Sequence, residues 1–235
     1  MISFIVPAHN EAALIGATLR ALHAAAATLV EPFEILLVDD ESSDATGEIA
    51  AKSGARVLRV AYRHIAATRN AGAAAAHGDR LVFVDADTHV DAQVLQAALC
   101  ALREGAAGGG AGVRLLGHRA WYERCAETFF IWAFRLARIA PGCFVFCSRA
   151  AFEAVGGFDL RYYAGEDVAF SRGMARRGRF VILRQAVRTS ARKLRTFTAL
   201  EHMKLFLRFA LRGRRMLHSR DALGLWYGER RSDRS

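Results

Sequence analysis

Two aspartates separated by one residue follow directly on an apolar run. Asp85 and Asp87 belong to the segment FVDADTHV, just after the run Leu81–Val84. Alternate side chains of an extended segment point the same way, so both carboxylates can address one site. Hard carboxylate oxygens suit Mg²⁺ or Mn²⁺, and these cations also bind the phosphates of substrates. The D-x-D pair therefore predicts a metal site, with Asp87 and Asp85 as ligands, that faces a phosphorylated substrate.

Further polar residues stand where two earlier apolar runs end. Pro7 and Glu11 belong to IVPAHNE, and VDDESSDAT carries Asp39 and Asp40. The carboxyl ends of parallel strands converge on a crevice where ligands bind. A carboxylate there can accept from a base N–H or a ribose hydroxyl, and Arg69 in TRNAG can reach a base or a phosphate. Acidic groups at three strand ends need cations and hydrogen-bond donors to face, and a metal-bound nucleoside diphosphate supplies both.

A fourth acidic motif, GEDVAF, opens a predicted helix with Glu166 and Asp167. Carboxylates in the first turn suit the helix dipole, and the side chains of adjacent helical residues diverge. A hydroxyl that attacks an activated sugar carbon must lose a proton, which a positioned carboxylate can accept. We therefore predict Asp167 as the general base and Glu166 as its support. Arg192, in VRTSARK, is expected to neutralise a departing diphosphate.

The elements that must position these residues alternate along the first half of the chain. Apolar runs at 3–6, 35–38, 57–60 and 81–84 predict strands, and each is followed by a segment of helical spacing. Such an alternation predicts a doubly wound, parallel sheet. After residue 105 the pattern changes to a glycine-rich extended segment, a helix over 121–138, strands at 144–147 and 180–183, and helices at 150–155 and 166–177.

Charge is distributed unevenly along the 235 residues. Residues 1–171 carry 15 Lys and Arg against 19 Asp and Glu, whereas residues 172–235 carry 18 against 4, giving the net charge of +10. We interpret residues 1–195 as one catalytic domain, with a nucleotide-sugar half at 1–104 and an acceptor half at 105–195. Residues 196–235 form a basic extension.

Residues 197–217 of this extension predict an amphipathic helix with apolar residues on one face and arginines around the rest. This arrangement suits the interface of an anionic membrane. No uninterrupted run of about 18 apolar residues is present, so a spanning helix is not expected. The four cysteines form no C-x-x-C pair and suit a reducing compartment. We expect a cytoplasmic enzyme, peripheral on the inner face of the cell membrane, and no nucleic-acid partner.

The ordered set P-A-x-N-E, V-D-D-x-S-x-D-x-T, R-N-x-G, D-A-D, G-G-F-D and E-D resembles glycosyltransferase family 2 over roughly residues 2–185. The resemblance implies an α/β fold of the GT-A type, a Rossmann-like, mostly parallel sheet to which the amphipathic C-terminal helix is appended. It also implies an inverting, metal-dependent transfer from a UDP- or GDP-linked sugar to a hydroxyl acceptor, with a lipid or lipid-linked acceptor as one candidate. The family's roles place Pro7, Glu11, Asp39 and Arg69 in the nucleoside pocket. Asp85 then contacts ribose or the Mn²⁺ or Mg²⁺ ion, Asp87 ligates the ion, and Asp167 is the base.

Other classes of protein fit these residues less well. The Q-x-x-R-W element and membrane helices of processive synthases are absent from the sequence. A nucleotidyltransferase that makes nucleotide sugars would carry G-x-G-x-R-x-x-P after the first strand, and an NAD-binding oxidoreductase would carry G-x-G-x-x-G there. A non-catalytic module that binds nucleotide sugars remains an alternative, although the presence of both Asp87 and Asp167 favours an enzyme.

Overall fold

The computed structural model describes residues 1–116 and 121–190. Its strands, in chain order, are β1 (Ile2–Ala8), β2 (Phe33–Asp40), β3 (Arg56–Val60), β4 (Arg80–Val84), β5 (Thr88–His89), β6 (Gly108–Leu115), β7 (Phe144–Ser148) and β8 (Phe180–Thr189). Its helices are α1 (Ala12–Ala26), α2 (Thr46–Lys52), α3 (Ile65–Ala75), α4 (Ala92–Arg103), α5 (Trp121–Ala137), α6 (Arg149–Val155) and α7 (Glu166–Arg177).

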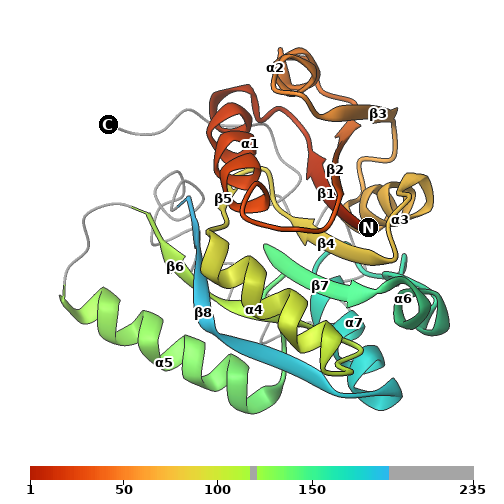
Figure 1. The fold of residues 1–235 in the computed structure, drawn as a ribbon. Helices are drawn as coiled ribbons and strands as arrows, with labels where there is room; N and C mark the ends of the chain where they lie inside the picture. The colour runs from red at the N-terminus through yellow and green to blue at the C-terminus, as the bar shows by residue number, and fades with distance from the viewer. Residues whose placement is uncertain (117–120, 191–235) are drawn as a thin grey trace.

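The strands form a sheet in the order β3-β2-β1-β4-β7-β6-β8-β5 (Figure 1). The first four strands in chain order, β1 to β4, pair in parallel, as the alternating pattern predicts. The other half is mixed, because β7 runs antiparallel to both β4 and β6 while β6 and β8 are parallel. The predicted α/β class with a mostly parallel, Rossmann-like sheet is therefore confirmed.

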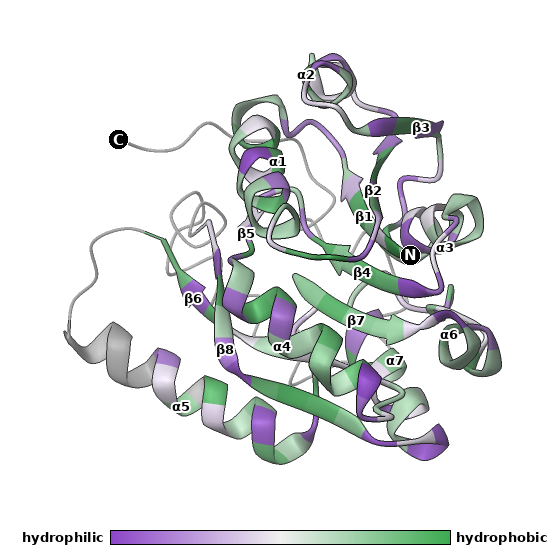
Figure 2. Cartoon of the chain, in the orientation of Figure 1, coloured by the Kyte–Doolittle hydropathy of each residue, from purple (hydrophilic) through white to green (hydrophobic). Residues whose placement is uncertain are grey.

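Helices cover both faces of the sheet and bury a hydrophobic core on each side. Side chains of α1 and α4 pack with one face of the central strands, and the side chains of α3, α6 and α7 pack with the other. The central strands are apolar on both faces, which is the pattern of a sheet covered on both sides. Figure 2 shows the hydrophobic central strands between helices that carry both hydrophobic and hydrophilic residues.

The glycine-rich segment predicted to be extended forms β6. A Cβ atom at Gly109 would collide with the carbonyl oxygen of Val181 in β8, and one at Gly110 would collide with Ala140. The run of glycines therefore allows backbone segments to approach one another more closely than side chains would permit.

Several local predictions need correction. The strand predicted at 180–183 extends to Thr189, because β8 continues along β6 beyond a register shift between Gly110 and Gly112. Strand β5 was not predicted, since its two residues carry no apolar pattern. Helix α2 begins after Ala45, without a side-chain cap. The predicted helix 197–217 lies outside the described residues, as does the extension 196–235.

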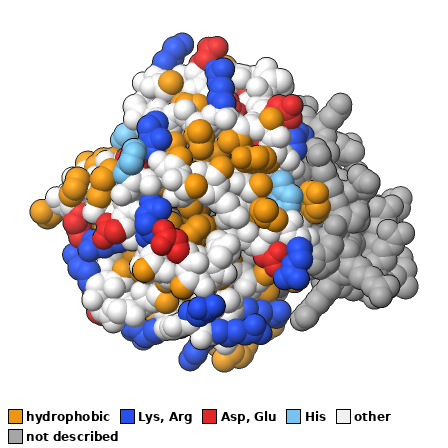
Figure 3. Space-filling view, turned by 90° about the vertical axis from the view of Figure 1, so that its right-hand side faces the viewer, with side chains coloured by type: hydrophobic (Ala, Val, Ile, Leu, Met, Phe, Trp, Pro, Cys, Tyr) orange, Lys and Arg blue, Asp and Glu red, His pale blue; other side chains and the backbone are white. Residues whose placement is uncertain are grey.

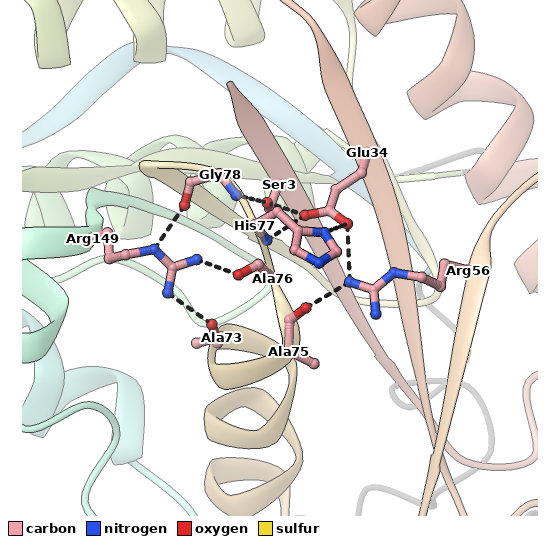
Figure 4. A network of polar contacts seen from close by, with 9 residues as sticks. All are labelled: Ser3, Glu34, Arg56, Ala73, Ala75, Ala76, His77, Gly78 and Arg149. Carbon is pink, nitrogen blue, oxygen red and sulfur yellow. Dashed lines mark hydrogen bonds and ion pairs between the residues drawn. The ribbon is translucent and has the colours of Figure 1, made fainter.

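A polar network ties the ends of the sheet opposite the acidic motifs (Figure 4). Glu34 of β2 accepts hydrogen bonds from the hydroxyl of Ser3, the backbone N–H of His77 and the guanidinium of Arg56. Burial raises the pKa of Glu34, but these hydrogen bonds outweigh it and lower the pKa to about 2. Arg149 donates to three carbonyls at the end of α3 and in the turn beyond, those of Ala73, Ala76 and Gly78. Both groups fix the turn between α3 and β4, which positions the strand that carries the D-A-D motif.

Within residues 1–116 and 121–190, no helix has the length and apolar character needed to cross a bilayer.

Candidate active site

The D-A-D segment follows β4 and is held by its backbone from three directions. The backbone N–H of Asp85 donates to the carbonyl of Cys143 at 3.1 Å, extending the pairing of β4 with β7. The buried hydroxyl of Thr18 in α1 donates to the carbonyl of Ala86 at 2.8 Å. The backbone N–H of Ser190, just after β8, donates to the carbonyl of Asp87 at 3.1 Å. The directions of the two carboxylates are thus set by elements from both halves of the chain.

Arg69 joins this segment to the E-D motif. Its side chain is 2% exposed, and its guanidinium forms ion pairs with Asp85 at 2.9 Å and with Glu166 at 2.7 Å. It also donates to the carbonyl of Gly142 at 2.8 Å and lies 5.2 Å from the centroid of the Phe158 ring. Burial lowers the pKa of Arg69, but the carboxylates of Asp85 and Glu166 more than offset this and raise its pKa. Arg69 is therefore a buried bridge within the site, and its predicted contact with a base or a phosphate stays a prediction.

Glu166 and Asp167 begin α7 and point to different partners, as their adjacency on a helix predicts. Glu166 is 6% exposed and bound to Arg69. Asp167 is half-buried and accepts two backbone N–H groups, those of Gly142 and Val168, both at 2.8 Å. Burial raises the pKa of both carboxyl groups, and the positive charge of Arg69 opposes the rise. A carboxylate with a raised pKa is a stronger base, and Asp167 is the more accessible of the two.

The loop before β7 is shaped to fit between these charged groups. A Cβ atom at Gly142 would lie 3.1 Å from Oδ2 of Asp167 and 3.2 Å from Nη2 of Arg69. Both contacts are tighter than side chains usually make, so glycine is the residue that lets the loop donate to Asp167 and accept from Arg69. Sequence reasoning gave no sign that Gly142 belongs to the site.

The R-N and G-G-F-D motifs contact each other directly. The side-chain amide of Asn70 donates to the carbonyl of Phe158 at 2.8 Å and accepts from the Phe158 N–H at 2.9 Å. Gly157 has a φ of 73°, and a Cβ atom there would lie 2.8 Å from Oδ1 of Asn70. This contact joins the two motifs and places the Phe158 ring beside the Arg69 guanidinium.

The predicted nucleoside residues lie at the ends of β1 and β2. Pro7 is buried in β1 opposite Val38, beyond the last pair of β1 with β4, so its missing N–H breaks no ladder with that strand. Glu11 is 5% exposed, and its backbone N–H donates to the hydroxyl of Thr46. Asp39 is 6% exposed and accepts from the Ser42 N–H at 3.2 Å.

Asp40 was also predicted to contact the nucleotide, but its carboxylate is used inside the protein. It accepts from the backbone N–H groups of Tyr62, Arg63 and His64, and from the hydroxyl of Thr68 at 2.7 Å. Four donors from the β3–α3 connection and α3 occupy both carboxylate oxygens. Asp40 therefore fixes the start of α3, the helix that carries Arg69.

Asp87 receives support from the far end of the described chain. The hydroxyl of Thr189 lies 3.2 Å from Oδ1 of Asp87, and the buried hydroxyl of Thr88 donates to Thr189 at 3.0 Å. The pairing of β5 with β8 brings these two threonines together. Sequence reasoning missed this contact because it depends on strand β5 and on the longer β8.

The D-A-D donor set fits a divalent cation that arrives with a phosphorylated ligand. Mg²⁺ is usually held by one or two carboxylates together with substrate phosphates, and not by a cage made only of protein groups. In the part of the chain that the structure describes, no group of three or more His, Cys, Asp and Glu side chains could hold a metal ion. Asp87 and Asp85 supply the two hard carboxylates that such a shared site requires.

The structure thus brings Arg69, Asp85, Glu166 and Asp167 into one connected cluster beside Asp87, with Glu11 and Asp39 at the neighbouring strand ends. Arg192 lies outside the described residues.

Comparison with known proteins gives a family match and several similar folds. Residues 3–156 match the model of the family described as "Glycosyl transferase family 2". Validoxylamine A glucosyltransferase of Streptomyces hygroscopicus subsp. jinggangensis is 33% identical over 108 residues, 43% of this chain and 25% of the relative. The matching protein from S. hygroscopicus subsp. limoneus is 32% identical over 108 residues. The matched segment thus spans about a quarter of the length of these curated relatives.

Two solved structures share the fold over most of the chain. TarS 1-349 of S. aureus, in complex with UDP, has a TM-score of 0.66 and 18% identity, covering 96% of this chain and 79% of that one. The mannosyltransferase PcManGT of Pyrobaculum calidifontis, in complex with GDP-Man and Mn²⁺, has a TM-score of 0.69 and 20% identity. The match covers 92% of this chain and 61% of PcManGT.

Proposed function

Since the chain belongs to glycosyltransferase family 2, we propose that it transfers a sugar, with inversion, from a nucleotide-diphosphate sugar to a hydroxyl acceptor. The observation that carries the proposal is the connected cluster of Asp85, Arg69, Glu166 and Asp167 at the carboxyl edge of the sheet. This cluster links the carboxylates expected to face a metal–diphosphate with the carboxylate expected to take a proton. The same edge is where α/β sheets bind their ligands.

In the proposed reaction, Asp167 accepts the proton of the acceptor hydroxyl. The hydroxyl oxygen forms a bond to the anomeric carbon from the face opposite the leaving group, and the bond from that carbon to the diphosphate oxygen breaks. The backbone N–H of Gly142 and the first turn of α7 hold the Asp167 carboxylate in place, and its raised pKa suits proton transfer. Glu166, fixed on Arg69, acts as support and not as the base.

Asp87, with Asp85, would hold Mn²⁺ or Mg²⁺, a cation that, when bound, neutralises charge on the diphosphate. Arg69 occupies Oδ1 of Asp85, and the Thr189 hydroxyl approaches Oδ1 of Asp87, so both carboxylates are oriented by the protein itself. The complex of PcManGT with GDP-Man and Mn²⁺ is consistent with this choice of cation. Arg192 remains our candidate for neutralising the departing diphosphate.

Pro7, Glu11 and Asp39 are proposed to line the nucleoside pocket. A Cβ atom at Gly47 of α2 would lie 2.8 Å from Oδ2 of Asp39, so a glycine is needed where this carboxylate lies. TarS is described in complexes with UDP and with UDP-GlcNAc, and PcManGT with GDP-Man. We therefore propose a UDP- or GDP-linked donor.

We propose a lipid or lipid-linked hydroxyl as the acceptor. The loop that carries Gly142, and so contacts Asp167, is the direct continuation of α5. Among the described residues, the exposed large hydrophobic side chains that lie on a helix all belong to α5, namely Phe129, Trp132, Phe134 and Leu136. The acceptor side of the site is thus adjacent to an apolar surface.

A panel of nucleotide sugars tests the donor proposal. Thermal unfolding of the full chain is measured with each sugar in Mn²⁺, in Mg²⁺ and in EDTA. A ligand at about 100 times its dissociation constant should stabilise the fold by about 2.7 kcal/mol. Transfer from a labelled donor then separates an enzyme from a binding module, because a module would be stabilised without releasing UDP or GDP. Stabilisation and turnover that persist unchanged in EDTA would refute the metal assignment.

A further inference from the structure

Helix α5 exposes several large hydrophobic side chains to solvent. Phe129, Trp132 and Leu136 are 61%, 58% and 71% exposed. Their spacing of three and four residues places them on one side of the helix, and we call this stripe the α5 apolar face. Figure 1 shows α5 at the margin of the molecule, alongside β6 and β8, so one side of the helix faces outward.

The two charged side chains of α5 that the structure describes, Glu127 and Arg135, are turned toward the protein instead. Arg135 donates to the carbonyl of Leu183 in β8 at 2.8 Å. The side chain of Glu127 is only 13% exposed and faces Arg114 of β6. A helix packed on a soluble domain normally shows the opposite arrangement, with apolar residues inward and charges outward. The side of the molecule seen in Figure 3, by contrast, intersperses charged with hydrophobic side chains. In α5, Ile131 packs inward next to Gly112 of β6, but three large apolar side chains stand outward, an arrangement that suits an apolar occupant on the outer side.

Exposed arginines lie at the end of α5 and on the strands against which it packs. Arg138, directly after the helix, and Arg184, next to the α5 contact at Leu183, are exposed, and the side chain of Arg114 is 66% exposed. The described side chains of α5, at 127–129 and 131–137, contribute no exposed carboxylate. A hydrophobic stripe with Trp and Phe, on a helix with exposed arginines at its end and on its neighbouring strands, matches the interface of an anionic bilayer in both apolarity and charge.

The size of the face favours lipid over a second copy of the chain. Large side chains bury roughly 150–250 Å² each, so three that are about two-thirds exposed offer on the order of 400 Å². A standard protein interface needs about 800 Å² from each partner. Insertion into lipid has no such minimum, since an interfacial helix gains from each apolar side chain it buries.

We infer that α5 is a membrane-docking helix, whose apolar face enters the interface of an anionic bilayer. Five residues beyond the end of α5, the backbone N–H of Gly142 donates to the Asp167 carboxylate at 2.8 Å. Between them, the backbone N–H of Ala140 donates to the hydroxyl of Ser171 in α7 at 3.0 Å. Docking would therefore hold the proposed acceptor side of the site close to the bilayer. The docking surface itself does not depend on the proposed transfer reaction.

Vesicle co-sedimentation of the full chain tests this surface. Vesicles of phosphatidylcholine with phosphatidylglycerol are compared with vesicles of phosphatidylcholine alone, at low and high salt. The variant Phe129→Ser/Trp132→Ser/Leu136→Ser should bind the anionic vesicles at least about tenfold more weakly. Val30→Ser removes a fully exposed apolar residue elsewhere and should bind like the unchanged chain. The basic extension is retained in every variant, so any loss reports on α5.

Quenching by brominated lipids adds a measurement of depth. The difference in fluorescence between the unchanged chain and Trp132→Phe isolates Trp132, which should lie about 5–10 Å into the interface. Equal vesicle binding by the triple variant, or an absence of vesicle binding by the unchanged chain, would overturn the inference. Loss of a dimer in the triple variant, without any vesicle binding, would assign the face to a second copy of the chain. Stabilisation by UDP with Mn²⁺, measured in parallel, reports on the proposed function separately.

Discussion

Replacing Arg69 by methionine should be among the most damaging single changes at this site. Methionine keeps much of the apolar stem beside Phe158 but removes the charge that Asp85 and Glu166 share. Arg69 is 2% exposed and Glu166 is 6% exposed, so water cannot take over the lost hydrogen bonds. Removing one partner of a buried ion pair costs about 3–5 kcal/mol, because the other charge remains buried and uncompensated. For a chain of this size, 1 kcal/mol shifts Tm by about 2–4 °C, so Tm should fall by roughly 6–20 °C.

The assay is urea and thermal unfolding of the full chain, with Arg103→Met as the matched control. Arg103 is 55% exposed and lies 3.5 Å from Glu31, and exposed pairs contribute about 0–1 kcal/mol. The double variant Arg69→Met/Glu166→Gln should recover part of the loss, since glutamine leaves no buried charge behind. Contacting residues of this kind show interaction energies of about 0.5–3 kcal/mol. A loss for Arg69→Met no larger than that for Arg103→Met, or strictly additive effects, would refute the description of Arg69 as a buried bridge.

Three further outcomes are expected. Asp167→Asn should lower the transfer rate by about 10²–10⁴-fold and leave donor affinity nearly unchanged. In the unchanged enzyme, the transfer rate should rise with pH as the Asp167 carboxyl deprotonates. Initial rates with a labelled donor measure both effects. Thr189→Val should weaken Mn²⁺-dependent UDP binding in a titration, because it removes the hydroxyl that approaches Asp87, whereas Thr189→Ser should restore it. Glu34→Gln should lower the free energy of unfolding by on the order of 3 kcal/mol at pH 7, because the pKa of Glu34 is lower in the folded than in the unfolded state. In urea titrations, the stability difference between the two proteins should shrink below about pH 4.5 and vanish near pH 2.

Each of these outcomes can fail in a specific way. A near-normal transfer rate in Asp167→Asn would move the role of base to another group. Equal UDP titrations for Thr189→Val and Thr189→Ser would show that the hydroxyl does not position Asp87. A stability difference for Glu34→Gln that is the same at pH 3 and pH 7 would mean that the carboxylate charge contributes nothing.

The sequence by itself determined the class of fold and the places where chemistry could occur. Apolar strands followed by helical periods predict a parallel sheet, because a strand buried on both faces must be apolar throughout. Residues at the ends of such strands must then meet at one edge, which placed the D-A-D motif and Asp39 correctly without any knowledge of contacts. The divergence of Glu166 and Asp167 also followed from local helix geometry alone.

Only the tertiary structure decided what each charged group does. Arg69 and Asp40 have the residue types of ligand contacts, but burial and long-range partners made one a bridge and the other an anchor for α3. Gly142, Thr189 and Asn70 act through contacts with residues 25 to 102 positions away along the chain, across separations that periodicity cannot detect. The outward direction of the α5 apolar face likewise depends on how that helix packs against β6 and β8. Local patterns fix elements because they act within a few residues, whereas the role of a side chain is set by neighbours that only folding brings together.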